Sequence, residues 1–121
     1  MNVFDSSALL AYIRKEPGAE VTEAALIAGG TCGAANWSEV AQKVTATGYR
    51  WAAVSRFLRA YPFTIEPVTR IDAEWAAARW RAGEGLSLGD RLCLALGERL
   101  DATVWTADGR WGEGGRIRQI R

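Results

Sequence analysis

Short apolar runs alternate with helical segments along the whole chain, and this alternation restricts the fold more than any other feature. Apolar runs of this length, bounded by polar residues, glycine or proline, are typical of buried strands. The predicted strands are Val3–Phe4, Thr31–Ala35, Phe63–Val68, Thr103–Thr106 and Ile117–Ile120.

The segments between these runs carry apolar residues at helical spacing, with glycine or proline near their ends. The predicted helices are Ser6–Ile13, Ala19–Ala28, Asn36–Thr47, Trp51–Ala60, Ile71–Ala82 and Ser87–Leu100. Strands that alternate with helices from end to end predict an α/β domain with a mainly parallel sheet covered on both faces. A length of 121 residues suits a single domain, residues 1–121.

Four acidic residues fall at the boundaries of these elements. Asp5 follows the first apolar run and Asp108 follows the fourth, whereas Glu39 and Asp90 lie in the first turns of predicted helices. In an open parallel sheet, ligands bind outside the carboxyl ends of the strands, where the strand order reverses. If the first and fourth strands are neighbours there, Asp5 and Asp108 share one crevice, and the two helix starts point into it.

The chain has no histidine, so any hydrolytic chemistry must rely on carboxylates and bound cations. Two unit charges roughly 4 Å apart repel by about 4 kcal/mol at an effective dielectric constant of about 20. A cluster of four carboxylates therefore needs protons or cations to neutralise it. Mg²⁺ or Mn²⁺ does so with oxygen ligands, activates water and stabilises charge on a phosphoryl oxygen. This chemistry suits phosphodiester hydrolysis.

Each of the four acids also has a purely structural interpretation. A carboxylate at the third position of a helix can bond back to the capping residue, and aspartate before glycine favours a turn. The expected caps and turn are Asn36 with Glu39, Ser87 with Asp90, Asp5 before the helix Ser6–Ile13, and Asp108 with Gly109. Capping and metal binding are compatible, because a carboxylate in the first turn can do both.

The composition says more about the cellular location of the protein than about its binding partner. Cys32 and Cys93 lack a metal-ligand pattern and are expected to be small buried hydrophobes. The start of the chain shows no signal peptide, and no apolar run is long enough to span a bilayer, so a cytoplasmic protein is expected. The net charge of +1 provides no bulk field toward nucleic acid. Arginine is the dominant cation, which fits an anionic partner or a GC-rich genome.

Four segments, in order and at matching spacing, resemble the PIN-domain ribonucleases, and most closely the VapC-type toxins of bacterial toxin–antitoxin pairs. The first is Val3-Phe4-Asp5-Ser6-Ser7-Ala8-Leu9-Leu10-Ala11-Tyr12. The others are Asn36-Trp37-Ser38-Glu39-Val40, Leu86-Ser87-Leu88-Gly89-Asp90-Arg91-Leu92-Cys93-Leu94-Ala95 and Thr106-Ala107-Asp108-Gly109-Arg110-Trp111. The resemblance covers the whole chain, and the third segment is the most specific.

This resemblance implies a three-layer α/β/α domain with four or five mainly parallel strands. It implies Mg²⁺- or Mn²⁺-dependent endonucleolytic cleavage of RNA, with tRNA, rRNA or mRNA as the substrate. It also implies a homodimer and a cognate VapB-type antitoxin that blocks the pocket. The implied catalytic residues and metal ligands are Asp5, Glu39, Asp90 and Asp108, supported by the hydroxyls of Ser7 and Thr106.

Residues beside the four acids have two interpretations each. Trp37 and Trp111 either stack on RNA bases or pack within the protein. Arg91 and Arg110 either contact RNA phosphate or pair with the acids. The tryptophans expected in the core are Trp75, Trp80 and Trp105.

The main alternative is a catalytically silent PIN-like module that binds RNA or protein, in which the acids serve only as caps and turns. A phospho-acceptor receiver domain is disfavoured because no lysine follows Lys43. A haloacid-dehalogenase-type phosphatase is disfavoured because serine, not aspartate, occupies position 7.

Overall fold

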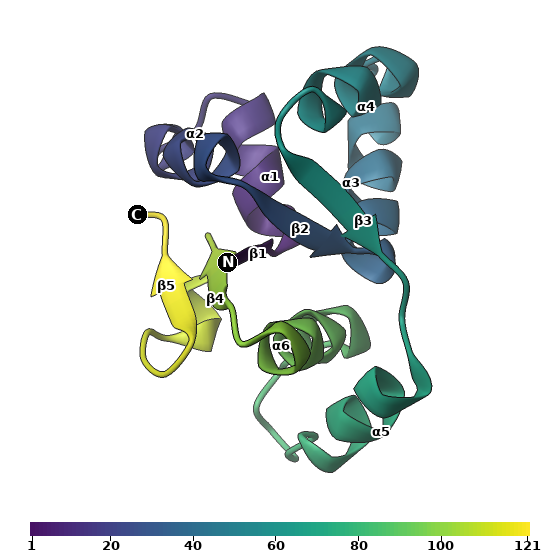
Figure 1. The fold of residues 1–121 in the computed structure, drawn as a ribbon, viewed down its shortest axis with the longest axis vertical. Helices are drawn as coiled ribbons and strands as arrows, with labels where there is room; N and C mark the ends of the chain where they lie inside the picture. The colour runs from purple at the N-terminus through teal and green to yellow at the C-terminus, as the bar shows by residue number, and fades with distance from the viewer.

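The computed structural model describes residues 1–121 and contains one five-stranded sheet (Figure 1). Every pair of neighbouring strands is parallel, and the strand order is β3-β2-β1-β4-β5. The strands are β1 (Asn2–Phe4), β2 (Gly30–Gly33), β3 (Phe63–Glu66), β4 (Thr103–Thr106) and β5 (Ile117–Gln119). The predicted α/β class and the parallel sheet are confirmed, with five strands.

Six α-helices and one 3₁₀ turn connect the strands. They are α1 (Ser6–Ile13), α2 (Ala19–Ala28), α3 (Ala34–Ala46), α4 (Trp51–Arg59), α5 (Arg70–Ala78), α6 (Leu88–Leu100) and η1 (Gly109–Trp111). The bounds of α1 and α2 are as predicted. Helix α3 begins at Ala34 rather than Asn36, and α5 ends at Ala78 rather than Ala82.

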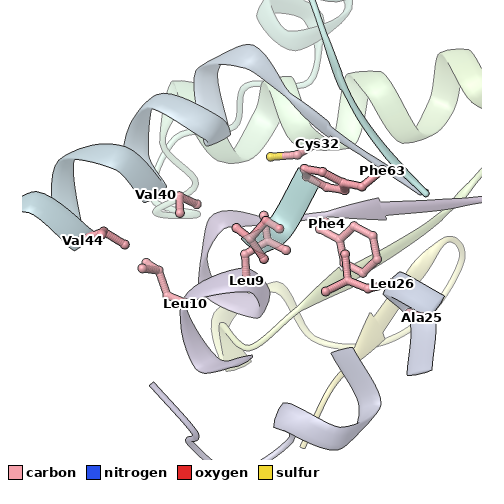
Figure 2. Packing of buried hydrophobic residues seen from close by; sticks show 10 residues of the cluster. Phe4, Leu9, Leu10, Ala25, Leu26, Cys32, Val40, Val44 and Phe63 are labelled. Atoms are coloured by element: carbon pink, nitrogen blue, oxygen red, sulfur yellow. The ribbon is translucent and has the colours of Figure 1, made fainter. Parts of the chain in front are cut away.

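The two faces of the sheet are separate halves of the core, because side chains alternate along β1. Phe4 packs with residues of α1, α2, α3 and α4, among them Leu9, Leu26 and Val40 (Figure 2). Val3 points to the other face and packs with Cys93 and other residues of α6. Helices therefore cover both faces, and α5 packs outside α6 (Figure 1).

Helix α6 lies unusually close to the sheet because Gly97 has no side chain. A Cβ atom at Gly97 would lie 2.3 Å from Cγ2 of Val104 in β4. The start of α6 is fixed by Ser87, whose hydroxyl accepts a hydrogen bond from the Asp90 amide at 3.1 Å. The helix that carries Asp90 is thus fixed at its start by Ser87 and packed closely on the sheet at Gly97.

One expectation for the core was wrong. Trp80 is 60% exposed, because α5 ends before it and the following loop turns it toward solvent. None of the helices combines the length and the apolar character that crossing a bilayer requires.

Candidate active site

The chain order of the strands reverses between β1 and β4. From β1 the sheet extends through β2 and β3 on one side, and through β4 and β5 on the other. Residues Asn2, Val3 and Phe4 pair in register with Thr103, Val104 and Trp105. The first and fourth strands are therefore neighbours, which meets the condition for a shared crevice, and the residues that follow them meet at one edge of the sheet.

Asp5 lies at the centre of this edge and is only 2% exposed. Its Oδ2 accepts hydrogen bonds from the hydroxyls of Ser7, at 2.5 Å, and Thr106, at 2.9 Å. Its Oδ1 is buried and has no hydrogen-bond partner. The pKa of Asp5 is raised to about 6, mainly by burial; the two hydroxyls oppose this rise, and the charges of Asp90 and Glu39 add to it.

Backbone amides orient the two hydroxyls that serve Asp5. The Ala107 N–H donates to Ser7 Oγ at 2.9 Å, and the Asp108 N–H donates to Thr106 Oγ1 at 3.0 Å. Each hydroxyl oxygen thus accepts from the backbone, which leaves its single proton for Asp5. This network holds one oxygen of Asp5 and leaves the other free to bind a ligand.

Glu39 lies in α3 and contacts the start of α6. The predicted capping box of Asn36 with Glu39 is wrong, because Gly33 is the N-cap and no side chain caps the helix. Instead, Asn36 Nδ2 donates to Glu39 Oε1 at 2.9 Å from within the same helix. A Cβ atom at Gly89 would lie 3.1 Å from that oxygen, so the carboxylate rests against the glycine beside Asp90.

Asp90 forms the predicted capping box with Ser87. The Ser87 N–H donates to Asp90 Oδ2 at 2.9 Å, and the Asp90 N–H donates to the Ser87 hydroxyl. The box uses one carboxylate oxygen and places the other at the positive end of the α6 dipole. Asp90 is therefore both a cap and a neighbour of Asp5, whose pKa it raises.

Asp108 caps η1 and is neutralised by its own neighbour. Its Oδ1 accepts from the Arg110 N–H at 3.0 Å, and its Oδ2 lies 2.6 Å from Arg110 Nη2. The Arg110 guanidinium holds the pKa of Asp108 below its ordinary value. The expected Asp108–Gly109 turn is present, and Arg110 pairs with an acid, one of its two expected roles.

The structure thus brings the four predicted residues to one edge of the sheet. Asp108 differs from the other three because Arg110 neutralises its charge. Asp90 and Glu39 are close enough to raise the pKa of Asp5, whereas Asp108 is linked to Asp5 by the Thr106 hydroxyl, which accepts from the Asp108 amide and donates to Asp5. No three acidic or cysteine side chains lie close enough together to hold a metal ion as they stand.

The donor set nevertheless fits a hard divalent cation. Mg²⁺ is held by about one or two carboxylates, with water completing its octahedral shell, so a cluster of three acids is not required. Asp5 Oδ1 is a buried oxygen without a partner, and such an oxygen is costly unless a ligand satisfies it. Asp90 offers a second carboxylate oxygen that the capping box does not use.

Apart from Arg110, the aromatic and basic residues next to the site pack against other parts of the protein. Trp37 packs against Trp51 and Phe63, with ring centroids 4.9 and 5.6 Å away. Trp111 is buried in the α6 half of the core. Arg91 donates to the Ala76 carbonyl at 2.7 Å. Cys32 and Cys93 are free and buried, as expected.

Sequence reasoning identified Asn36 only as a cap and missed its contact with Glu39. The signal was present, because residues at positions i and i+3 of a helix lie on the same face. It could be interpreted only once the helix was known to begin at Ala34, which places Asn36 inside the first turn.

The fold and the site define a class: a parallel α/β domain with a buried aspartate and further acids at its strand-order reversal. The family model of the PIN domain matches residues 3–116, and the chain belongs to this family. A solved structure described as a toxin–antitoxin complex from Klebsiella pneumoniae superposes with a TM-score of 0.79 at 18% identity, covering 100% of this chain and 98% of that one. This likeness shows the shared fold. A comparison with curated proteins gives no significant match.

Proposed function

We propose that this chain is a metal-dependent endoribonuclease and the toxin of a toxin–antitoxin pair. Its substrate class is RNA, with tRNA, rRNA or mRNA as candidates, and its partners are a second copy of the chain and a VapB-type antitoxin. The observation that carries the proposal is the buried, unpartnered Oδ1 of Asp5 at the strand-order reversal, within the field of Asp90 and Glu39.

Two comparisons support the proposal. PIN domains are generally nucleases, so family membership favours a hydrolase of phosphodiester bonds. A protein with the same fold is described as part of a toxin–antitoxin complex, which favours the same setting for this chain.

Under this proposal Asp5, Asp90, Glu39 and Asp108 hold Mg²⁺ or Mn²⁺. The bound ion supplies an activated water and stabilises charge on the phosphoryl oxygens. Ser7 and Thr106 keep Asp5 oriented and favour its ionised form, because both donate to the carboxylate. Arg110 lies at the exposed rim, where its cation keeps Asp108 ionised.

A cleavage assay tests the proposal. Purified protein would be incubated with total tRNA or rRNA, with Mn²⁺ and with EDTA. We expect Mn²⁺-dependent fragments that Asp5→Asn and Asp90→Asn abolish. Glu74→Gln is a matched control, because Glu74 is a solvent-exposed acid on α5, and it should cleave as the wild type does. Equal cleavage by the wild type and Asp5→Asn would reject the proposal.

Two observations favour a silent binding module as the second candidate. The capping box engages one oxygen of Asp90, and Arg110 neutralises Asp108, so both acids have structural uses. Metal titration separates the candidates, since a ligand that binds only the folded state raises the melting temperature. A melting temperature that Mg²⁺ and Mn²⁺ leave unchanged would favour the silent module.

A further inference from the structure

Asn36 is a buried polar side chain that lies between α3 and α6. It is the third residue of α3 and is 1% exposed. Its Nδ2 donates two hydrogen bonds, to Glu39 Oε1 at 2.9 Å and to the Gly89 carbonyl at 3.1 Å. One amide group therefore connects a carboxylate of the site to the backbone of the helix that carries Asp90.

The chemistry of the two partners fixes the orientation of this amide. A carboxylate oxygen and a carbonyl oxygen are both acceptors, so only an NH₂ group can face them. Rotating the amide would turn Oδ1 toward two acceptors and lose both bonds. The remaining Oδ1 is buried without a partner, so burying Asn36 leaves one acceptor unsatisfied.

We propose that Asn36 is a positioning residue that holds the Glu39 carboxylate against the first turn of α6, beside Asp90, so that both acids serve the metal site near Asp5. A residue that only joined two helices would need a single bond to the Gly89 carbonyl. The second bond, to Glu39, restrains a flexible side chain that otherwise has three rotatable bonds. The inference rests on the proposed function, because it assigns Glu39 a task at that site.

The test measures the Mn²⁺ concentration that gives half of the maximal thermal stabilisation, for four proteins: wild type, Asn36→Ala, Glu39→Ala and the double variant. Removing a residue that orients a metal-binding side chain typically weakens metal binding about 10- to 100-fold. We expect a loss of that size for Asn36→Ala. We expect the double variant to resemble Glu39→Ala alone, because Asn36 acts through Glu39.

Two further variants guard against a simple folding defect. Asn36→Leu keeps the approximate size of the side chain, removes its donor and adds no charge, so it should weaken Mn²⁺ binding about as much as Asn36→Ala. Thr22→Val removes another buried hydrogen bond, from Thr22 Oγ1 to the Ala8 carbonyl, outside the site. It should lower the melting temperature and leave the Mn²⁺ response unchanged.

The outcomes separate this inference from the proposed function. Additive losses in the double variant, or a wild-type Mn²⁺ response in Asn36→Ala and Asn36→Leu, would overturn the role of Asn36 even if the protein cleaves RNA. Coupled losses in a protein that cleaves no RNA would support the role of Asn36 and reject the nuclease. A wild type without any Mn²⁺ response would overturn the inference, because Glu39 would have no site to serve.

Discussion

The Thr106 hydroxyl donates a hydrogen bond of 2.9 Å to Asp5 Oδ2, joining the ends of β4 and β1 across 101 positions of the chain. This bond exists only because the two strands are neighbours at the strand-order reversal. Thr106 is fully buried, and its hydroxyl oxygen accepts from the Asp108 amide while its proton is donated to Asp5. It therefore links two of the four acids without being an acid itself.

Replacing Thr106 by valine keeps the shape of the side chain and removes this donor. A hydrogen bond to a charged group contributes about 1.5–3 kcal/mol, so the pKa of Asp5 should rise by about one to two units. We expect RNA cleavage by Thr106→Val to fall at pH 7 and to recover partly at higher pH. The pH–rate profiles of the variant and the wild type measure this shift. Identical profiles would show that Thr106 does not act through Asp5.

The metal-free protein should lose stability as the pH rises from about 4 to about 6. Burial raises the pKa of folded Asp5 from 3.8 to about 6, so the folded state binds more protons than the unfolded state in this window. The free energy of unfolding then falls with pH, by about 3 kcal/mol at most. Urea unfolding in EDTA at several pH values measures the slope. Asp5→Asn should have a smaller slope, and equal slopes would contradict the burial of an ionisable Asp5.

Gly89→Ala tests the position of Glu39 without changing an acid. The new methyl group would lie 3.1 Å from Glu39 Oε1, so the flexible end of that side chain must retreat. Alanine favours a helix over glycine by about 1 kcal/mol, so the melting temperature should not fall. We expect weaker Mn²⁺ stabilisation and slower RNA cleavage. Full activity would show that Glu39 need not rest against α6.

Asp72 should matter for stability and not for chemistry. It caps α5 with Thr69 and pairs with Arg99 of α6, with Arg99 Nε 2.9 Å from Asp72 Oδ1. Burial acts to raise the pKa of Asp72, but these bonds hold it below its ordinary value. The stability that Asp72 contributes to the fold is therefore present at neutral pH and is lost in acid. Asp72→Asn should lower the free energy of unfolding by about 1–3 kcal/mol.

The control for Asp72 is Glu74→Gln, which removes an exposed pair with Arg70 at 3.9 Å. Exposed ion pairs contribute little, so its denaturation curve should overlay that of the wild type. RNA cleavage by folded Asp72→Asn should match the wild type, and a loss of activity without a loss of stability would place Asp72 in the site.

Local sequence patterns predicted the elements, because short apolar runs and helical spacing are local signals. The sequence left open whether β1 and β4 are neighbours, because strand order depends on contacts far apart in the chain, and the structure shows that they pair. The start of α3 was misplaced, since Gly33 and the two alanines after it carry no side-chain capping group, and the helix begins directly after Gly33, the last residue of β2 that pairs with β3. Trp80 was misplaced because its burial depends on where α5 stops.

The sequence predicted which residues belong to the candidate site, but it did not predict how their side chains contact one another. Asp5 and Asp90 follow from the strand end and the helix start, which the sequence marks. Whether an acid is free to bind a ligand depends on its contacts in the folded protein. Burial leaves Asp5 Oδ1 without a hydrogen-bond partner, whereas Arg110 forms an ion pair with Asp108. The orienting contact of Asn36 depends on α3 and α6 lying side by side.

The most direct measurement is anomalous diffraction from a crystal grown with Mn²⁺. The central claim is that Asp5 Oδ1 accepts a divalent cation at the end of β1, together with Asp90. We predict an anomalous peak about 2.1–2.2 Å from this oxygen, close to the distance typical of a hard divalent ion, and no peak there in Asp5→Asn. A fully loaded crystal whose peaks all lie away from Asp5 would contradict the claim.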